Sequence, residues 1–411
     1  MQHILQLVLA WINSFRNKTV KKIFKLEFPF SFKSEGALKL KRRSIAEINH
    51  KIKSGDIQVL TVDEFKKLVE NSGVQRAFKE VDVVTTATFG PMCSSGAFLN
   101  FGHSEPPIKM EKLWLNDVEA YHGMAAVDCY IGATKMSITR GFEYGGGHVI
   151  EDLISGKEIE LKAVAYGTHC YPRKVLETTF TLKDLNQAIL VNPRNCYQRY
   201  NAATNSTDET LYTYMGVLLP NYGNITYAGC GEISPLINDP TYETIGVGSR
   251  IFLGGGTGYI IGEGTQHNPK RGFGTLMVKG DLKQMHPEYL AGATFQNYGV
   301  TLYVGIGIPI PILSKKTVEK AAIRDEEIFT KILDYGVPSR DRPSLRDVSY
   351  AELKSGKVVI ANKNVKTACT SSIKKAQEIM KKLKEWIAQA TFYLTEPVER
   401  LPRDVEYHHM K

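Results

Sequence analysis

Residues 81–90, "VDVVTTATFG", decide the fold class, because they are a run rich in β-branched residues that stops at a glycine. Such a run predicts a strand that ends at Gly90. Just upstream, residues 44–60 read "SIAEINHKIKSGDIQVL". This segment predicts a helix that begins after Ser44 and stops at Gly55, followed by a short strand.

A second helix is expected between these two strands. Thr61 and Glu64 have the spacing of a capping box, and we expect the helix to end at about Glu70. Residues 110–310 are rich in strands and glycine turns, and residues 371–394 show the apolar spacing of an amphipathic helix. Together these segments predict a mixed α/β fold, with a strand-rich core of glycine turns, flanking helices and reactive cysteines at strand ends.

The charge of the chain is concentrated at its beginning. Residues 1–43 contribute +8 of the formal net charge of +9, so the remainder is nearly neutral, which argues against a phosphate-binding groove and against nucleic acid as a partner. No run approaches the ~20 apolar residues of a transmembrane segment. Residues 1–38 are predicted to be a basic extension: a membrane-surface helix, an organelle-targeting segment or, as we favour, a dispensable addition to a cytoplasmic protein.

The cysteines are dispersed, with no two closer than 26 residues and no CxxC pair. This spacing predicts reduced thiols and no metal site. We expect no tightly bound cofactor, so that electrons come from outside the chain. The six are Cys93, Cys129, Cys170, Cys196, Cys230 and Cys369.

Two of these cysteines share one construction. Cys93 in "VVTTATFGPMCSSG" and Cys170 in "LKAVAYGTHCYPRK" each follow, by three residues, a glycine that ends a β-type run. Cationic neighbours favour the thiolate, and Cys170 has His169, Arg173 and Lys174 close by in sequence. These two thiols are the candidate reactive groups.

Two glycine-rich stretches, residues 145–148 and 254–267, match neither a P-loop nor a dinucleotide fingerprint. They are interpreted as tight turns or as the backbone wall of a pocket for a small polar substrate. His148 and His267 each end one of these stretches and are candidate site residues.

Three arginines are candidates for gripping a carboxylate with two parallel hydrogen bonds: Arg173, Arg194 and Arg250. Cys129 lies in an apolar run and is predicted to be structural. Serine hydrolase chemistry is not supported, since no GxSxG motif occurs.

Five long stretches carry a family resemblance: "VDVVTTATFGPMCSSGAFLNFGHSEPPIKM", "YGGGHVIEDLISGKE", "AYGTHCYPRK", "ILVNPRNCYQRYNAATN" and "FLGGGTGYIIGEGTQHNP". They resemble the homocysteine-biosynthesis, sulfur-incorporating family, the L-aspartate-semialdehyde sulfurtransferases of methanogenic archaea and anaerobic bacteria. The resemblance runs from about Lys41 to about Pro402. It implies a catalytic region at 39–402 and a tail at 403–411, and it leaves residues 1–38 outside the family pattern.

The resemblance implies that Cys170 is the sulfur-carrying nucleophile and that Cys93 is its helper. The implied reaction converts L-aspartate 4-semialdehyde to L-homocysteine through a cysteine persulfide formed from sulfide or a persulfide donor. A Cys93–Cys170 disulfide would form as product leaves, and a separate ferredoxin-like iron–sulfur protein or a dithiol would supply two electrons. His148, His169 and His267 are the candidate general acids.

The alternative function is a non-catalytic persulfide carrier or redox scaffold that delivers sulfur to another enzyme. The two functions differ in whether the chain alone makes homocysteine. If the paired-thiol mechanism holds, both sulfurs are expected to face one cavity.

Overall fold

The predicted first helix and strand are confirmed. The structure, a computed structural model, describes residues 42–410, so the predicted extension at 1–38 lies outside the described residues. Helix α2 (Ile45–Ser54) begins after Ser44, whose side chain accepts a hydrogen bond from the Glu47 backbone N–H. It ends at Gly55, which adopts the left-handed conformation with φ of 80°.

The second helix is longer than predicted. Helix α3 runs over Val62–Glu80, and the expected end at Glu70 is wrong. Gly73 has a non-helical backbone with φ of 76°, so the chain kinks there and then resumes its helical path. The second part continues because Ala77 is fully buried against the core, and this packing outweighs the local stop signal.

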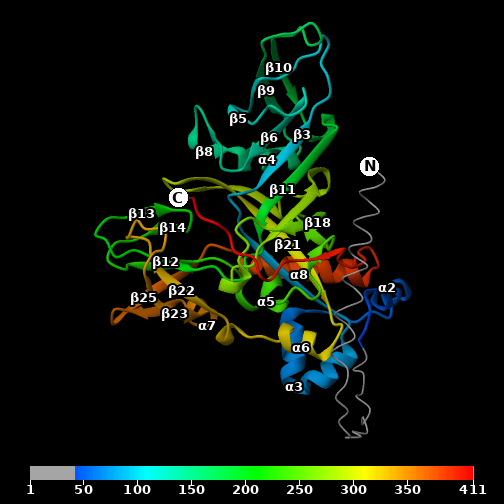
Figure 1. Cartoon of the computed structure of the whole chain (residues 1–411), viewed down its shortest axis with the longest axis vertical. Coiled ribbons are helices and arrows are strands. Elements are labelled where there is room, and N and C mark those ends of the chain that lie inside the picture. Colours follow the sequence, from blue (N-terminus) through cyan, green and yellow to red (C-terminus); the bar gives the residue numbers. More distant parts are fainter. Residues whose placement is uncertain (1–41, 411) are drawn as a thin grey trace, which may run out of the picture. The chain divides into compact units, whose positions relative to one another are not determined.

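The helices of the described chain are few and mostly short (Figure 1). Besides α2 and α3 they are α4 (Gly146–Ile154), α5 (Pro235–Asn238), α6 (Lys315–Ala321), α7 (Tyr350–Lys354) and α8 (Ile373–Ala388), with 3₁₀ turns at Leu182–Asp184, Gly231–Ile233, Pro269–Arg271, Leu282–Gln284 and Asp325–Glu327.

The largest sheet within residues 42–410 has ten strands and is antiparallel except where β1 runs parallel to β2. Its order is β1-β2-β21-β17-β18-β19-β11-β3-β6, with β20 paired to β21. The strands are β1 (Val59–Thr61), β2 (Val83–Pro91), β3 (Gly96–Asn100), β6 (Asp128–Gly132), β11 (Gln187–Asn195), β17 (Arg250–Leu253), β18 (Gly256–Glu263), β19 (Leu276–Asp281), β20 (Leu290–Phe295) and β21 (Gly299–Pro311). Strand β21 pairs with β2, β17 and β20 and is the centre of the sheet.

Two six-stranded sheets flank it. One has the order β10-β9-β4-β5-β7-β8 and is formed by β4 (Lys112–Leu115), β5 (Val118–Ala120), β7 (Met136–Ser137), β8 (Gly141–Gly145), β9 (Ile159–Val164) and β10 (Val175–Phe180). The other has the order β23-β22-β12-β15-β25-β24 and is formed by β12 (Ala202–Thr204), β15 (Asn224–Tyr227), β22 (Phe329–Asp334), β23 (Ser344–Ser349), β24 (Lys357–Ile360) and β25 (Lys363–Cys369). Two-stranded pairs are formed by β13 (Leu211–Thr213) with β14 (Gly216–Leu218) and by β16 (Gly246–Val247) with β26 (Glu399–Arg400).

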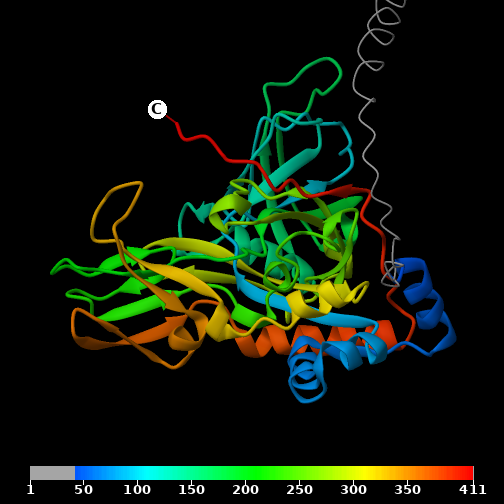
Figure 2. The ribbon, with the colours of Figure 1, turned by 60° about the horizontal axis from the view of Figure 1, so that its bottom comes forward.

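Helix α8 confirms the amphipathic pattern predicted for residues 371–394. Its buried side chains, Ala376, Ile379, Met380, Leu383 and Ile387, pack on β2 and β21. Figure 2 shows α8 lying along one face of the central sheet, with α3 beside it. The lysines fall on the opposite, solvated side, as the spacing predicted.

The start of α8 and the end of β2 approach closely because of Gly90. A Cβ built on Gly90 would lie 2.6 Å from the Ser371 Oγ. The Ser372 N–H donates to the Phe89 carbonyl at 2.9 Å, which fixes the approach. The absence of a side chain at position 90 thus places the first turn of α8 beside the end of β2.

The predicted mixed α/β class is confirmed, with a strand-rich core and helices at its faces. Within the part of the chain that the structure describes, no helix is both long enough and apolar enough to cross a bilayer.

Candidate functional site

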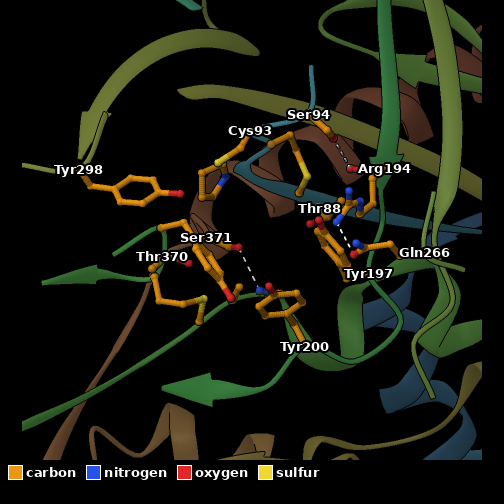
Figure 3. Close-up of a pocket in the computed structure, with 16 residues that line it drawn as sticks. Thr88, Cys93, Ser94, Arg194, Tyr197, Tyr200, Gln266, Tyr298, Thr370 and Ser371 are labelled. Atoms are coloured by element: carbon orange, nitrogen blue, oxygen red, sulfur yellow. Dashed lines mark hydrogen bonds between the residues drawn. The ribbon is translucent and has the colours of Figure 1, made fainter. Parts of the chain in front are cut away.

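A cavity of about 330 Å³ opens where β2 ends. Its walls come from segments that are far apart in the sequence, and Figure 3 shows their side chains converging on one space. The lining residues are Thr88, Pro91, Met92, Cys93, Ser94, Arg194, Tyr197, Tyr200, Tyr214, Met215, Ala228, Gly229, Gln266, Tyr298, Thr370 and Ser371.

Cys93 supplies the thiol of this cavity. It lies two residues after β2, in a turn closed by the Ser95 N–H, which donates to the Met92 carbonyl at 3.0 Å. The buried Asn192 side chain donates to the Ser95 Oγ at 2.7 Å and holds the turn. The Thr301 hydroxyl donates to the Cys93 Sγ at 3.5 Å and orients the sulfur. The predicted placement of Cys93 at a strand end is therefore confirmed.

Arg194 is the charged side chain of the cavity among its described lining residues. Its Nε donates to the Thr265 Oγ1 at 3.0 Å, and its Nη1 donates to the Gln266 Oε1 at 2.6 Å. A guanidinium has five N–H donors, so these two bonds fix its plane and leave further donors for an anion. Figure 3 shows Arg194 and Gln266 together on one side of the cavity.

Four tyrosines, Tyr197, Tyr200, Tyr214 and Tyr298, line the rest of the cavity. Burial raises the pKa of Tyr197 to about 12 and also raises the pKa of Tyr200 and of Tyr298. These three phenols therefore stay protonated at neutral pH and can donate hydrogen bonds to a small polar ligand.

The positive end of α8 meets the cavity wall. The helix begins at Ile373, directly after the lining residues Thr370 and Ser371. Helix dipoles favour negative charge at their N-termini. Arg194 and α8 together make this cavity suited to an anionic substrate that reacts with a thiol.

Cys170 lies elsewhere. It is exposed, in the loop of residues 165–174 that joins β9 to β10, and it does not line the Cys93 cavity. Figure 1 shows the β9–β10 hairpin at the top of the view, well apart from β12, β13 and β14. The expectation that both sulfurs face one cavity is therefore wrong for a single chain. Also, β9 ends at Val164 rather than at Gly167, so Cys170 is a loop residue and not a strand-end residue.

Contacts within the same region hold the loop in place. The Thr168 N–H donates to the Tyr171 carbonyl at 2.9 Å, and the Tyr171 ring stacks on His103 with centroids 5.9 Å apart. The Arg173 guanidinium donates to the Glu105 carbonyl. Arg173 is thus engaged beside Cys170, while His169 is exposed in the same loop.

The structure leaves three other predicted site residues outside the cavity. His148 lies on α4 and stacks on Tyr144, with centroids 5.4 Å apart. His267 is buried and bonded through both ring nitrogens, to the backbones of Thr275 and Pro402, although its neighbour Gln266 lines the cavity. Arg250 lies over the Phe392 ring, 4.8 Å from its centroid.

The glycine stretches serve packing and turns rather than the cavity. A Cβ on Gly146 would lie 1.9 Å from the Gly132 carbonyl oxygen, so the glycines at 145–147 allow α4 to dock on the sheet. Gly254 and Gly255 have positive φ and form the turn between β17 and β18. Neither stretch lines the Cys93 cavity.

Three of the remaining thiols, Cys129, Cys196 and Cys230, are buried, and Cys369 is half-buried. Cys129, predicted to be structural, is fully buried in β6. Burial raises the pKa of Cys369 to about 12 and also raises the pKa of Cys129, Cys196 and Cys230. These four thiols stay protonated at neutral pH. Cys170 is exposed and Cys93 lines the cavity, so these two remain the candidate reactive sulfurs.

Sequence reasoning missed the tyrosines and Gln266. Tyr197 and Tyr200 stand three and six residues after Arg194 in "NPRNCYQRY", and Gln266 stands beside His267, so two of the segments singled out in the sequence contain lining residues. Tyr214, Tyr298 and the pair 370–371 give no local signal, because only the tertiary fold brings them to the cavity.

Comparison with known proteins gives a consistent result. Residues 57–394 match the model of the family described as homocysteine biosynthesis enzyme, sulfur-incorporation. The chain is 59% identical over 369 residues to an L-aspartate semialdehyde sulfurtransferase of Methanosarcina acetivorans, covering 90% of this chain and 74% of that protein. It is 56% identical over 376 residues to the enzyme of the same name from Methanocaldococcus jannaschii, covering 88% and 74%. An uncharacterized protein of Methanothermobacter thermautotrophicus is 32% identical over 327 residues. No similar solved structure was found.

Proposed function

This chain belongs to the sulfur-incorporating homocysteine biosynthesis enzymes, and from that premise we propose that it converts L-aspartate 4-semialdehyde to L-homocysteine. The observation that carries the proposal is the cavity at the end of β2, which joins one thiol, Cys93, to one anion-binding side chain, Arg194. The substrate is an aldehyde with an α-carboxylate, so it has one group for each.

The cavity suggests how the substrate is oriented. The α-carboxylate accepts hydrogen bonds from the Arg194 guanidinium, which Thr265 and Gln266 hold in a fixed plane. The aldehyde then points toward Cys93, and the cavity tyrosines donate to its oxygen. A cavity of about 330 Å³ fits a small amino-acid aldehyde with space for a second reacting sulfur.

The chemistry we propose uses two cysteines. Cys170 carries a persulfide whose terminal sulfur adds to the aldehyde carbon. Cys93 then attacks the Cys170 sulfur, which forms a Cys93–Cys170 disulfide and releases the new sulfur bound to the substrate carbon as a thiohemiacetal. Sulfide reopens the disulfide, which restores the persulfide on Cys170 and the thiol on Cys93.

Electrons enter after the sulfur is in place. The thiohemiacetal loses water, and two electrons and two protons reduce the carbon–sulfur double bond to homocysteine. The sum is aldehyde plus hydrogen sulfide plus two electrons and two protons, giving thiol plus water. We propose a separate iron–sulfur protein or a dithiol as the electron donor.

The test is homocysteine formation by the purified chain from the semialdehyde, sulfide and a dithiol or reduced iron–sulfur protein. Cys93→Ser and Cys170→Ser are expected to lose at least about 100-fold in kcat, roughly the effect of removing a covalent nucleophile. Cys129→Ala, which removes a buried thiol that does not line the cavity, is the matched control and is expected to keep its activity.

Two results would overturn the proposal. The first is a wild-type chain that forms no homocysteine but hands persulfide sulfur to another protein, which is the behaviour of a carrier. The second is a Cys93→Ser variant with wild-type turnover, because the cavity would then not be the site of the chemistry.

A further inference from the structure

One chain does not complete the proposed active site. The proposed reaction requires two sulfurs at one aldehyde carbon, yet Cys170, the exposed cysteine, is not among the described lining residues of the Cys93 cavity. The loop at 165–174 is tied to its own region by the Tyr171 stack on His103 and by the Arg173 bond to Glu105. Bringing Cys170 to Cys93 within one chain would break these contacts and unseat a hairpin that is paired along its whole length.

The tip of this hairpin exposes an apolar surface. Tyr166 is 59% exposed and Val175 is 60% exposed, and they lie on the two sides of Cys170. Val164, paired with Val175 at the end of the hairpin, is also exposed. Apolar side chains gathered around an exposed thiol are typical of a surface that another protein covers.

The mouth of the Cys93 cavity offers a matching surface. Tyr298 lines the cavity and is 41% exposed. The β13–β14 hairpin, whose turn supplies the lining residues Tyr214 and Met215, also exposes Tyr212 and Leu219. These three side chains are thus each 40–45% exposed.

The charges of the two surfaces are complementary. The loop at 165–174 carries Arg173 and Lys174 and no acidic residue. The exposed Asp208 and Glu209 lie in the loop that leads into β13, the strand that precedes the lining residues Tyr214 and Met215. Opposite charges on surfaces of similar apolar character favour one docking orientation.

We propose that Cys170 of one chain enters the Cys93 cavity of a second copy of the chain, so that each active site is built from two chains. This inference rests on the proposed function and specifies where its second thiol comes from. A two-fold pair is the simplest arrangement, because each chain then gives its loop to the other and two complete sites result.

Mixed dimers of two differently tagged chains, purified through both tags, test the proposal. In a dimer of Cys93→Ser with Cys170→Ser, sharing between chains leaves one site with both cysteines and one with neither. Such a dimer is expected to have about half of the wild-type homocysteine-forming activity, although each variant alone is inactive. A site contained within one chain gives no activity here, because each chain then lacks one cysteine.

The reciprocal dimer gives the opposite result with the same number of cysteines. It pairs a wild-type chain with a Cys93→Ser/Cys170→Ser chain. Sharing between chains leaves one cysteine in each site, so this dimer is expected to be inactive, whereas a site within one chain keeps half of the activity. Both dimers carry two cysteine-to-serine substitutions, so a general effect of the substitutions cannot produce this difference in activity between them.

The outcomes separate this inference from the proposed function. The shared site is overturned if the wild-type protein is active and its reciprocal dimer keeps half of that activity. It is also overturned if sedimentation shows that the active wild-type protein is a monomer. In both cases the proposed function stands. A wild-type protein that forms no homocysteine overturns the function itself. In the shared site, oxidation of wild type is also expected to give a covalent dimer on a non-reducing gel, and Cys170→Ser is expected to abolish it.

Discussion

Replacing Arg194 with lysine tests how the cavity recognises its substrate. Thr265 and Gln266 hold the Nε and Nη1 atoms, and the remaining N–H groups can give a carboxylate two parallel hydrogen bonds. A lysine keeps the charge but can give only one such bond in this position. The loss is therefore one charge-assisted hydrogen bond, about 2 kcal/mol.

A loss of about 2 kcal/mol corresponds to about a 30-fold change in affinity. We expect Arg194→Lys to raise KM for the semialdehyde by about that factor and to leave kcat within about twofold, because the carboxylate is bound equally in the ground state and in the transition state. Initial rates of homocysteine formation over a range of aldehyde concentrations measure both constants. Arg199→Lys is the matched control, since Arg199 is exposed and lies outside the cavity.

The control substrate is 3-aminopropanal, which lacks the carboxylate of the semialdehyde. Wild type and Arg194→Lys are expected to use it equally poorly, since the guanidinium then has no partner to lose. An unchanged KM for the semialdehyde in Arg194→Lys would refute the assignment of the carboxylate to this side chain. A fall in kcat at constant KM would also refute it, because the role would then lie in the chemical step.

Three further predictions concern stability and the chain's beginning. Burial lowers the pKa of Lys66 from 10.5 to about 8, so the unfolded state binds more protons than the folded state between these pH values. Relative to Lys66→Met, the free energy of unfolding of wild type is therefore expected to rise by about 3 kcal/mol from pH 8 to pH 10.5 in urea titrations. A difference between the two proteins that does not change with pH would contradict this. Gly90→Ala is expected to lower the free energy of unfolding by about 1–3 kcal/mol and to lower kcat/KM, because the new Cβ would meet the Ser371 Oγ. Adding Ser371→Ala is expected to restore part of the stability. If the effects of the two substitutions on stability are strictly additive, that contact is excluded. A chain that starts at Lys39 is expected to keep its kcat/KM, since the lining residues found within residues 42–410 lie between Thr88 and Ser371. Loss of turnover with unchanged stability would place the extension in the site.

Local signals in the sequence predicted local structure well. A helix was expected to begin after Ser44, and Thr61 and Glu64 were identified as a capping box; both helices begin with a capping box in the structure. Gly73 shows the limit of such signals. A glycine after "ENS" reads as a stop, but the buried Ala77 makes it favourable for the helix to continue beyond it.

The site was predicted in its parts rather than as a whole. Cys93 was found because a strand end followed by a turn is a local pattern, and Arg194 was found as one of three candidate arginines. The choice among Arg173, Arg194 and Arg250 depends on which of them shares a cavity with Cys93, and only tertiary contacts decide that. The sequence around Cys170 resembles that around Cys93, although Cys170 lies in a hairpin loop and Cys93 at a strand end. A glycine that follows a β-type run occurs in both settings, so the sequence alone does not distinguish them.

Helix α8 packs on β2, and the residues just before it close the cavity around Cys93. During synthesis, Cys93 leaves the ribosome long before Ser371 does, an interval on the order of tens of seconds at typical rates of elongation. Until that last wall arrives, the cavity lacks Thr370, Ser371 and the N-terminus of α8, although its four tyrosines have already been synthesised. The cavity that we propose as the active site is therefore completed only when the C-terminal helix has docked.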